Sequence, residues 1–172
     1  MPSLLDIVTH TPAAVWVALS VLVAIGVRQL RTHTVVAAKV WIVPLIVGAA
    51  SLAGALRGFA GAGELLTGAC WAAGVAIGLA SNRWLDLPRR VSANTDGSFT
   101  IGGSVAPLLI FLSVFAERYV VGVALAIQPS LGTNPGAAAA AAIAYGFTAG
   151  LLGGRSRKIW ASRGASAGVL AA

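Results

Sequence analysis

Charged residues are scarce in this sequence. Only 10% of its 172 residues are Asp, Glu, Lys or Arg, whereas a soluble domain normally carries about a quarter. Because 58% of the residues are hydrophobic, too few polar side chains remain to cover a water-soluble fold. The composition therefore excludes an ordinary soluble domain and predicts an integral membrane protein.

Cysteine and histidine are nearly absent. Cys70 is the only cysteine, which excludes a disulfide framework and a thiolate metal site. His10 and His33 flank the first apolar segment, and about 23 residues of helix would hold them about 30 Å apart, too far to ligate one metal ion. The sequence also has no glycine-rich phosphate loop and no Ser, His and Asp set. We therefore expect no metal, no cofactor and no enzymatic activity.

Acidic residues are also few, with five against twelve Lys and Arg, and the net charge is +7. A nucleic-acid-binding protein would gather its basic residues on one polar face. Here ten of the twelve flank the ends of apolar segments that share one side of a membrane, and only Arg57 flanks the opposite ends. This excludes nucleic acid as a partner. By the positive-inside rule it places the N-terminus outside and the C-terminus in the cytoplasm.

Five apolar segments follow one another along the chain, at about residues 12–27, 40–56, 65–81, 105–127 and 136–153. Their length of about 17 to 23 residues matches the about 30 Å of a bilayer's hydrocarbon core. No Lys or Arg precedes the first segment, so we expect a permanent span rather than a cleaved signal. Thr11 can cap this span and Pro12 suits its first turn. The fold class is therefore an all-α bundle of five transmembrane helices, forming one domain over residues 1–172.

Two polar stretches lie on the predicted cytoplasmic side. Residues 83–103 connect the third and fourth spans, and Asp96-Gly97 within them favours a type I′ turn between two short strands. A plain polar loop is the alternative. Residues 155–172 form a basic cytoplasmic tail. Tryptophans lie near predicted span ends, where indole rings favour the membrane interface: Trp16, Trp41, Trp84 and Trp160.

Glycines recur at helical spacing in two spans. Gly74 and Gly78 in the third span match Gly146 and Gly150 in the fifth at one sequence offset. Together with prolines early in the second and fourth spans, this suggests one helix followed by two repeated helical hairpins. Glycines four residues apart let helix backbones approach closely. We expect another span of the same chain as the partner, with a homodimer interface as the alternative.

One span carries full charges at its centre. In "LIFLSVFAERYVVGVALAI", Glu117 and Arg118 are adjacent, and an ionised group at this depth costs at least about 2.5 to 3.5 kcal/mol. Neighbours on a helix point about 100° apart, so each side chain needs a further partner. Arg57 and Glu64 end and open neighbouring spans, with Asp6 and His10 above them. We predict an outward-facing polar cluster of Glu117, Arg118, Arg57 and Glu64.

Two roles are open for this cluster. It can be an interhelical ion pair, for instance between Glu117 and Arg57, that fixes the register of the helices. Alternatively, it can line a water-filled cavity that binds an ion or small polar solute, with Glu117 as a proton or cation site.

Two stretches carry a resemblance to a known family. The opening "DIVTHTPAAVWVALSVLVAIGVRQLR", above all residues 9–16, and the span "GSVAPLLIFLSVFAERYVVG", residues 103–122, resemble a family of small, uncharacterised bacterial inner-membrane proteins. The layout is also faintly similar to the small multispan protein of cytochrome c biogenesis operons. The family usually has a basic Arg-Thr-Val segment after the first span, whereas this chain reads "RTHTVVAAK". The resemblance implies an inner-membrane location and a multispan topology, but no activity.

Two function classes follow. The first is transport or binding of a small solute, ion or proton through the polar cluster. The second is a non-transporting factor that assembles or docks onto another membrane protein, for example in respiratory or cytochrome biogenesis. The expected partners are the lipid bilayer and either a second copy of the chain or another membrane protein.

Overall fold

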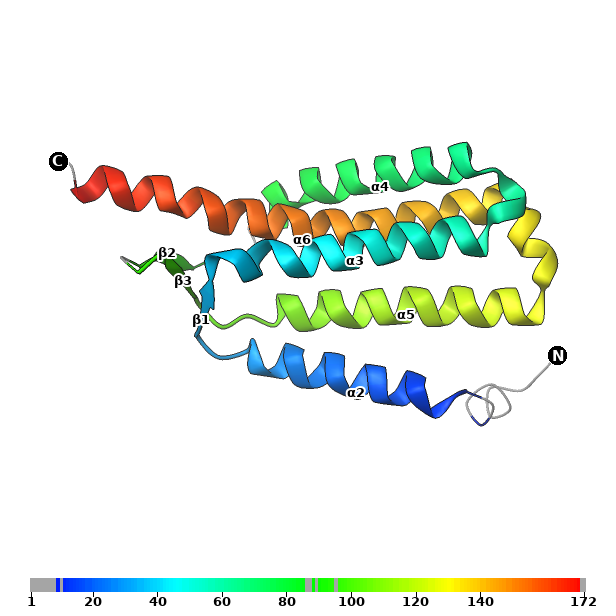
Figure 1. Cartoon of the computed structure of the whole chain (residues 1–172), viewed down its shortest axis with the longest axis horizontal. Helices are drawn as coiled ribbons and strands as arrows, with labels where there is room; N and C mark the ends of the chain where they lie inside the picture. The colour runs from blue at the N-terminus through cyan, green and yellow to red at the C-terminus, as the bar shows by residue number, and fades with distance from the viewer. Residues whose placement is uncertain (1–8, 10, 86–87, 89, 95, 171–172) are drawn as a thin grey trace.

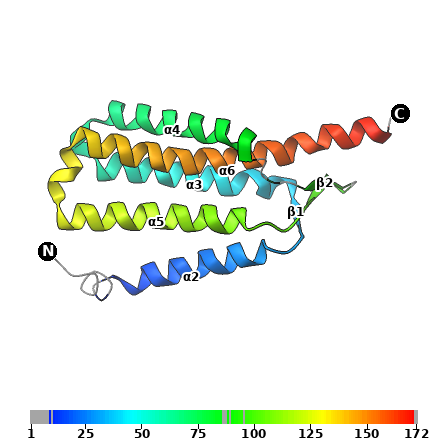
Figure 2. The same cartoon turned by 180° about the vertical axis from the view of Figure 1, so that it is seen from behind.

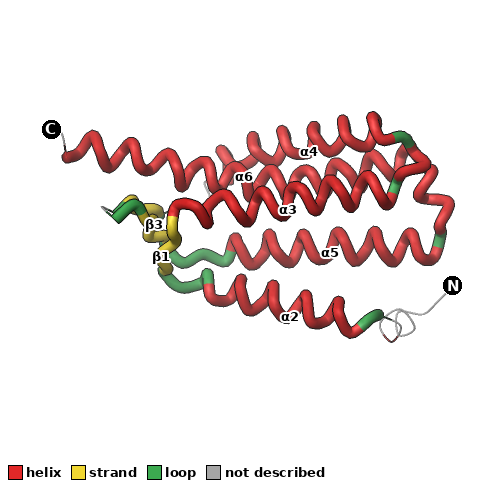
Figure 3. The backbone as a smooth tube through the Cα atoms, in the orientation of Figure 1, coloured by secondary structure: helices red, strands yellow, loops and turns green. Residues whose placement is uncertain are grey.

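The computed structural model describes residues 9, 11–85, 88, 90–94 and 96–170, and of residues 164–170 the backbone alone. Long helices lie side by side, and a small sheet lies at one end of the bundle (Figures 1 and 3). The described elements are α2 (Ala13–Arg28), β1 (His33–Val36), α3 (Ala37–Gly58), η1 (Ala60–Ala62), α4 (Glu64–Leu85), β2 (Val91–Ala93), β3 (Ser98–Ile101), α5 (Ala106–Ile127), η2 (Pro129–Thr133) and α6 (Pro135–Leu170). Asp6 and His10, expected near the outer end of the bundle, lie outside the described residues.

The five predicted segments are all helical. Four of these helices, α3 to α6, are long and apolar enough to cross a membrane. Helix α2 is apolar but has 16 residues, or about 24 Å at 1.5 Å per residue, which is less than the about 30 Å of a hydrocarbon core. Helix α6 continues through the basic segment to Leu170, so the predicted tail and the fifth span share one helix.

Helix α6 is the centre of the bundle. It packs chiefly against α4 and α3 and also contacts α5, whereas α2 lies at the edge of the bundle and packs on α5 (Figures 1 and 2). Small residues make this central position possible, since Ala138 and Ala142 are fully buried where α6 meets its neighbours. Larger side chains of α5 and α6, among them Phe111 and Leu152, form a second buried cluster.

The four predicted glycines lie in the α4–α6 contact, where each faces the backbone of the opposite helix. A Cβ atom on Gly78 would lie 3.0 Å from the Cα atom of Gly150, and a Cβ atom on Gly150 would lie 3.0 Å from that of Gly78. A Cβ atom on Gly74 or Gly146 would likewise strike backbone of the opposite helix. The partner of each glycine pair is therefore another helix of the same chain. We call this contact the glycine seam.

The glycine seam is symmetric. Gly74 faces the carbonyl oxygen of Ile143, and Gly146 faces that of Trp71, which precedes Ile143 by the same 72 residues that separate the two glycines. Helices α4 and α6 also run in the same direction, from the η1–η2 end toward the sheet (Figure 1). A pseudo-twofold relation between the two helices supports the interpretation of the chain as one helix and two repeated hairpins.

The predicted hairpin is part of a larger sheet. Strands β2 and β3 pair antiparallel, and β1 pairs with the other edge of β3, giving the order β1-β3-β2. Strand β1, with the sequence "HTVV", is not among the elements predicted from the sequence, because four residues are too few to show the alternation of a strand. Phe99 and Ile101 anchor the sheet by packing on Val40 and Ile159 of the bundle.

The turn differs from the expected one. The N–H of Gly97 donates to the carbonyl of Asn94, and the N–H of Asn94 donates to the carbonyl of Ser98, so the loop is one residue longer than a type I′ turn. Gly97 has a φ of 79°, which is the left-handed conformation that closes such three-residue loops.

Candidate functional site

The adjacent charges on α5 point to different neighbours, as their helical spacing requires. Glu117 is half-buried and its carboxylate accepts a hydrogen bond of 3.1 Å from the hydroxyl of Thr148 on α6. The same hydroxyl lies within 3.4 Å of the carbonyl oxygens of Ala144 and Tyr145. The carboxylate thus gains one donor in the bundle interior.

Arg118 lies against an aromatic ring rather than a carboxylate. Its guanidinium carbon is 5.3 Å from the centroid of the Tyr145 ring, within the range of a cation–π contact. Space for the guanidinium comes from Gly54 of α3, where a Cβ atom would lie only 2.9 Å from a guanidinium nitrogen. The ring offsets part of the cost of holding this cation away from water.

Arg57 and Glu64 do not join this arrangement. Arg57 lies in the last turn of α3 and Glu64 in the first turn of α4, and both side chains are exposed. Among the described residues, no N···O distance of 4.0 Å or less pairs any two of Glu117, Arg118, Arg57 and Glu64. The structure therefore separates Glu117 and Arg118, which lie within α5, from Arg57 and Glu64, which lie at helix ends. Helix ends explain Arg57 and Glu64, since a base at a C-terminus and an acid at an N-terminus complement the helix dipole.

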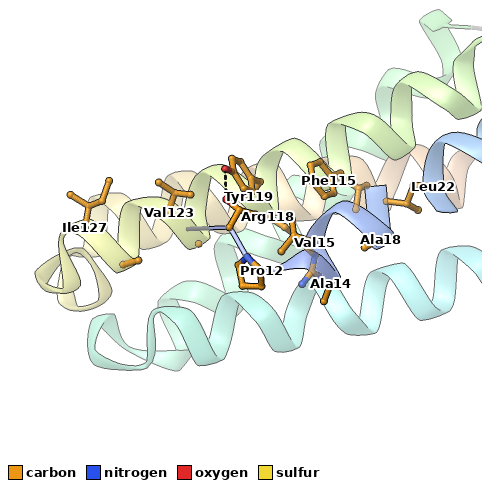
Figure 4. Close-up of a pocket in the computed structure, with 14 residues that line it drawn as sticks. Pro12, Ala14, Val15, Ala18, Leu22, Phe115, Arg118, Tyr119, Val123 and Ile127 are labelled. Atoms are coloured by element: carbon orange, nitrogen blue, oxygen red, sulfur yellow. Dashed lines mark hydrogen bonds between the residues drawn. The ribbon is translucent and has the colours of Figure 1, made fainter. Parts of the chain in front are cut away.

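A groove lies between α2 and α5, with a cavity volume of about 830 Å³. We call it the α2–α5 groove (Figure 4). Its lining residues are Thr11, Pro12, Ala14, Val15, Ala18, Leu22, Val114, Phe115, Arg118, Tyr119, Gly122, Val123, Ala126 and Ile127.

One polar contact closes the groove near the start of α2. The hydroxyls of Thr11 and Tyr119 are 2.9 Å apart and share a hydrogen bond, drawn dashed in Figure 4. Thr11 therefore ties α2 to α5 instead of capping its own helix, whose N-cap is Pro12 without a side-chain bond. Tyr119 also stacks on Phe115, with ring centroids 5.9 Å apart.

Among the described residues that line the α2–α5 groove, Arg118 alone has a charged side chain. Lying near the middle of α5, it offers a fixed positive charge and several N–H donors to whatever occupies an otherwise apolar space. The arrangement can recognise an acidic group attached to an apolar body. Its described lining residues include no nucleophile paired with a general base. No group of three His, Cys, Asp or Glu residues that could hold a metal ion occurs in the described part of the chain.

Sequence reasoning missed two groups at this site. Thr148 and Tyr145 are three residues apart in an Ala-rich span, where a polar pair stands out, and that spacing was a usable signal. The groove itself left no signal, because the apolar residues that line it on α2 and α5 look like residues facing lipid.

Comparison with known protein families matches residues 2–167 to a family of unknown function (DUF6622). No curated protein and no solved structure matches the chain. The resemblance to an uncharacterised family is thus confirmed over nearly the whole length. The chain belongs to this family of unknown function.

Proposed function

We propose that this chain is a multipass membrane protein that binds a small apolar organic anion in the α2–α5 groove, as a step in its transport. Arg118 would contact the acidic group of the solute, and the apolar walls would hold its body. The observation that carries this proposal is that Arg118 lines an apolar groove, rests its guanidinium on the Tyr145 ring, and has no carboxylate within ion-pair distance among the described residues.

The energetics favour an anion over a cation or a neutral solute. An ionised side chain among apolar helices is costly, and such groups usually pair with an opposite charge or a ligand. Tyr145 supplies only an aromatic face, so a bound carboxylate would gain charge-assisted hydrogen bonds from the guanidinium. Glu117 lies toward α6 and is not part of the groove lining, so it would not repel this ligand at contact distance.

The size of the groove suits a chain-like molecule. Its lining covers residues 11–22 and 114–127, or about 20 Å along the helices at 1.5 Å per residue. Arg118 lies part of the way along, so a short hydrocarbon carboxylate could lie lengthwise with its acidic end at the guanidinium.

The proposed location is the inner membrane of a bacterium. The basic residues that flank the sheet end of the bundle favour a cytoplasmic position for that end. The groove then lies in the outer half of the membrane, on the side of the η1 and η2 connections.

A binding titration tests the proposal with decanoate and decanol, which share a body and differ in charge. In the purified wild-type protein, we expect decanoate to bind more tightly than decanol. Arg118→Gln should weaken decanoate by about tenfold or more, because a hydrogen bond to a charged group contributes about 1.5 to 3 kcal/mol. Arg57→Gln, an exposed arginine outside the lining, is the control and should bind decanoate as wild type does. Equal decanoate binding by Arg118→Gln would exclude the proposed role of this residue.

A second function, docking of another membrane protein, is favoured by one observation. Ala14 and Ala18 on α2 and Gly122 and Ala126 on α5 line the groove with small residues four apart, a spacing that lets a foreign helix approach closely. Ala18→Trp would fill this space. If the groove receives a partner helix, Ala18→Trp should abolish co-purification of that partner while Arg118→Gln preserves it. If the groove binds a solute instead, both variants should weaken decanoate binding, Arg118→Gln by about tenfold or more.

A further inference from the structure

A second, smaller cleft lies at the opposite end of the glycine seam from the η1 and η2 connections. Its volume is about 180 Å³, and it opens between the end of α4 and the middle of α6. We call it the basic cleft. Its lining residues are Leu79, Asn82, Arg83, Gly154, Arg157 and Lys158.

The basic cleft is polar at its base because of how the two helices meet. Asn82 is buried, with 8% of its surface exposed, and it packs on Gly154 so closely that a Cβ atom there would lie 2.8 Å from the Cβ atom of Asn82. Helix α4 ends at Leu85, whereas α6 continues past it. The basic side chains of the continuing helix therefore stand beside the end of α4.

The charges in this cleft exceed what helix ends explain. Arg83 lies in the last turn of α4, where a cation complements the helix dipole. Arg157 and Lys158 lie in the interior of α6, far from either of its ends, and gain nothing from that dipole. Among the described residues that line the cleft, three side chains are basic, one is an amide and none is acidic. This combination suits an anion with several acceptor oxygens.

Two tryptophans mark the depth of the cleft. Trp84 follows Arg83 directly and is 91% exposed, and Trp160 lies two residues after Lys158 and is 41% exposed. Exposed indole rings at the ends of membrane-crossing helices lie at the level of the lipid headgroups. A group bound at this depth would therefore lie at the level of the lipid phosphates rather than in the hydrocarbon core.

We infer that the basic cleft binds the phosphate group of an anionic phospholipid headgroup between α4 and α6. Basic pockets between membrane-crossing helices on the cytoplasmic side are the usual way in which proteins hold such headgroups. The cleft and the α2–α5 groove share no lining residue and lie toward opposite ends of the bundle. The two proposals can therefore fail separately.

Native mass spectrometry of the full chain in detergent tests the inference, since detergent removes the charged membrane surface that would attract any basic protein. The probes are phosphatidylglycerol and phosphatidylcholine with the same acyl chains. We expect tighter binding of the first phosphatidylglycerol, and loss of this preference in the double variant Arg83→Gln/Arg157→Gln. The loss should exceed about tenfold, because the double variant removes two hydrogen bonds to a charged group, each of which contributes about tenfold or more to binding.

The control is Arg28→Gln/Arg31→Gln, which removes two exposed arginines near the sheet end of the bundle but outside the cleft. It should keep the preference for phosphatidylglycerol. An equal loss in both double variants would overturn the inference, because it would show a general effect of positive charge.

Inorganic phosphate at millimolar concentration should neither displace phosphatidylglycerol nor raise Tm. If it does either as effectively as the lipid, the assignment to a lipid headgroup is wrong.

Discussion

At the scale of single residues, Glu117 and Arg118 are adjacent charges in the bundle interior, and each has its own stabilising contacts. Glu117 gains the Thr148 hydroxyl, and Arg118 gains the Tyr145 ring and the space at Gly54. Each contact crosses from α5 to another helix, so the pair links α5 to α3 and α6. A role in holding helices and a role in binding solute are compatible here, because Glu117 faces the bundle and Arg118 also lines the groove.

Thr148→Val tests the contact with Glu117. Removal of the hydroxyl leaves the half-buried carboxylate without its donor, and we expect the free energy of unfolding to fall by about 1.5 kcal/mol. In a Glu117→Leu background the same change should cost less than about 0.5 kcal/mol, because the interaction is already gone. Denaturant unfolding in detergent measures both values. An equal loss in the two backgrounds would show that the hydroxyl acts through the carbonyls of its own helix instead.

At the scale of elements, the glycine seam fixes how α4 meets α6. Gly78→Ala places a methyl group against backbone atoms of Phe147 and Gly150, which cannot move aside as a flexible side chain would. We expect a loss of about 2 to 3 kcal/mol in the free energy of unfolding, at the upper range for overpacking. Gly68→Ala is the matched control on the same helix, because its Cβ atom would meet nothing within 4 Å. Gly68→Ala should leave the free energy of unfolding unchanged or raise it by up to about 1 kcal/mol. If Gly68→Ala and Gly78→Ala destabilise the protein equally, close packing at the glycine seam is not the cause.

The β2–β3 turn should respond to acid. The hydroxyl and amide of Ser98 donate to the Asp96 carboxylate, at 2.6 and 2.9 Å, and these bonds lower the pKa of Asp96 below its ordinary value of 3.8. A lowered pKa means that the stabilisation is fully present above pH 3.8 and is lost as the pH falls through the lower value in the folded state. Amide hydrogen exchange at Ser98 should therefore speed up, relative to its intrinsic rate, in this acid range. Asp96→Asn should remove the dependence; a turn that titrates identically in this variant contradicts the assignment.

The elements themselves could be predicted from sequence more readily than their contacts. The length of each apolar segment predicted a helix there, and the glycine spacing indicated a close helix contact. Strand β1 could not be predicted, since His33–Val36 is too short for a period and gains its stability from pairing with β3. The partners of Glu117 and Arg118 depend on the order of helices around α6. Hydropathy does not encode that order, so the sequence could not separate Arg57 and Glu64 from Glu117 and Arg118.

At the scale of the whole molecule, the charge distribution predicts one orientation in the membrane. Single-cysteine variants in a Cys70→Ser background can report it, with Ser92→Cys on the sheet and Ser130→Cys in η2, both at exposed positions. In intact bacterial cells, a membrane-impermeant maleimide should label the cysteine at position 130 and not that at position 92. Cell lysis should expose both, which serves as the control. Labelling of position 92 alone in intact cells would reverse the orientation and place the basic cleft outside.

The central claim is that the α2–α5 groove holds an organic anion at Arg118, and photocrosslinking in native membranes tests it most directly. The probe is a fatty acid that carries a diazirine on its chain, with the corresponding alcohol as the uncharged control. We expect the acid to label α2 and α5 residues of the groove lining, the alcohol to label them much less, and Arg118→Gln to reduce labelling by the acid to the level of the alcohol. Labelling spread over all the lipid-facing helices, or unchanged by Arg118→Gln, would show that the groove does not hold an organic anion at Arg118.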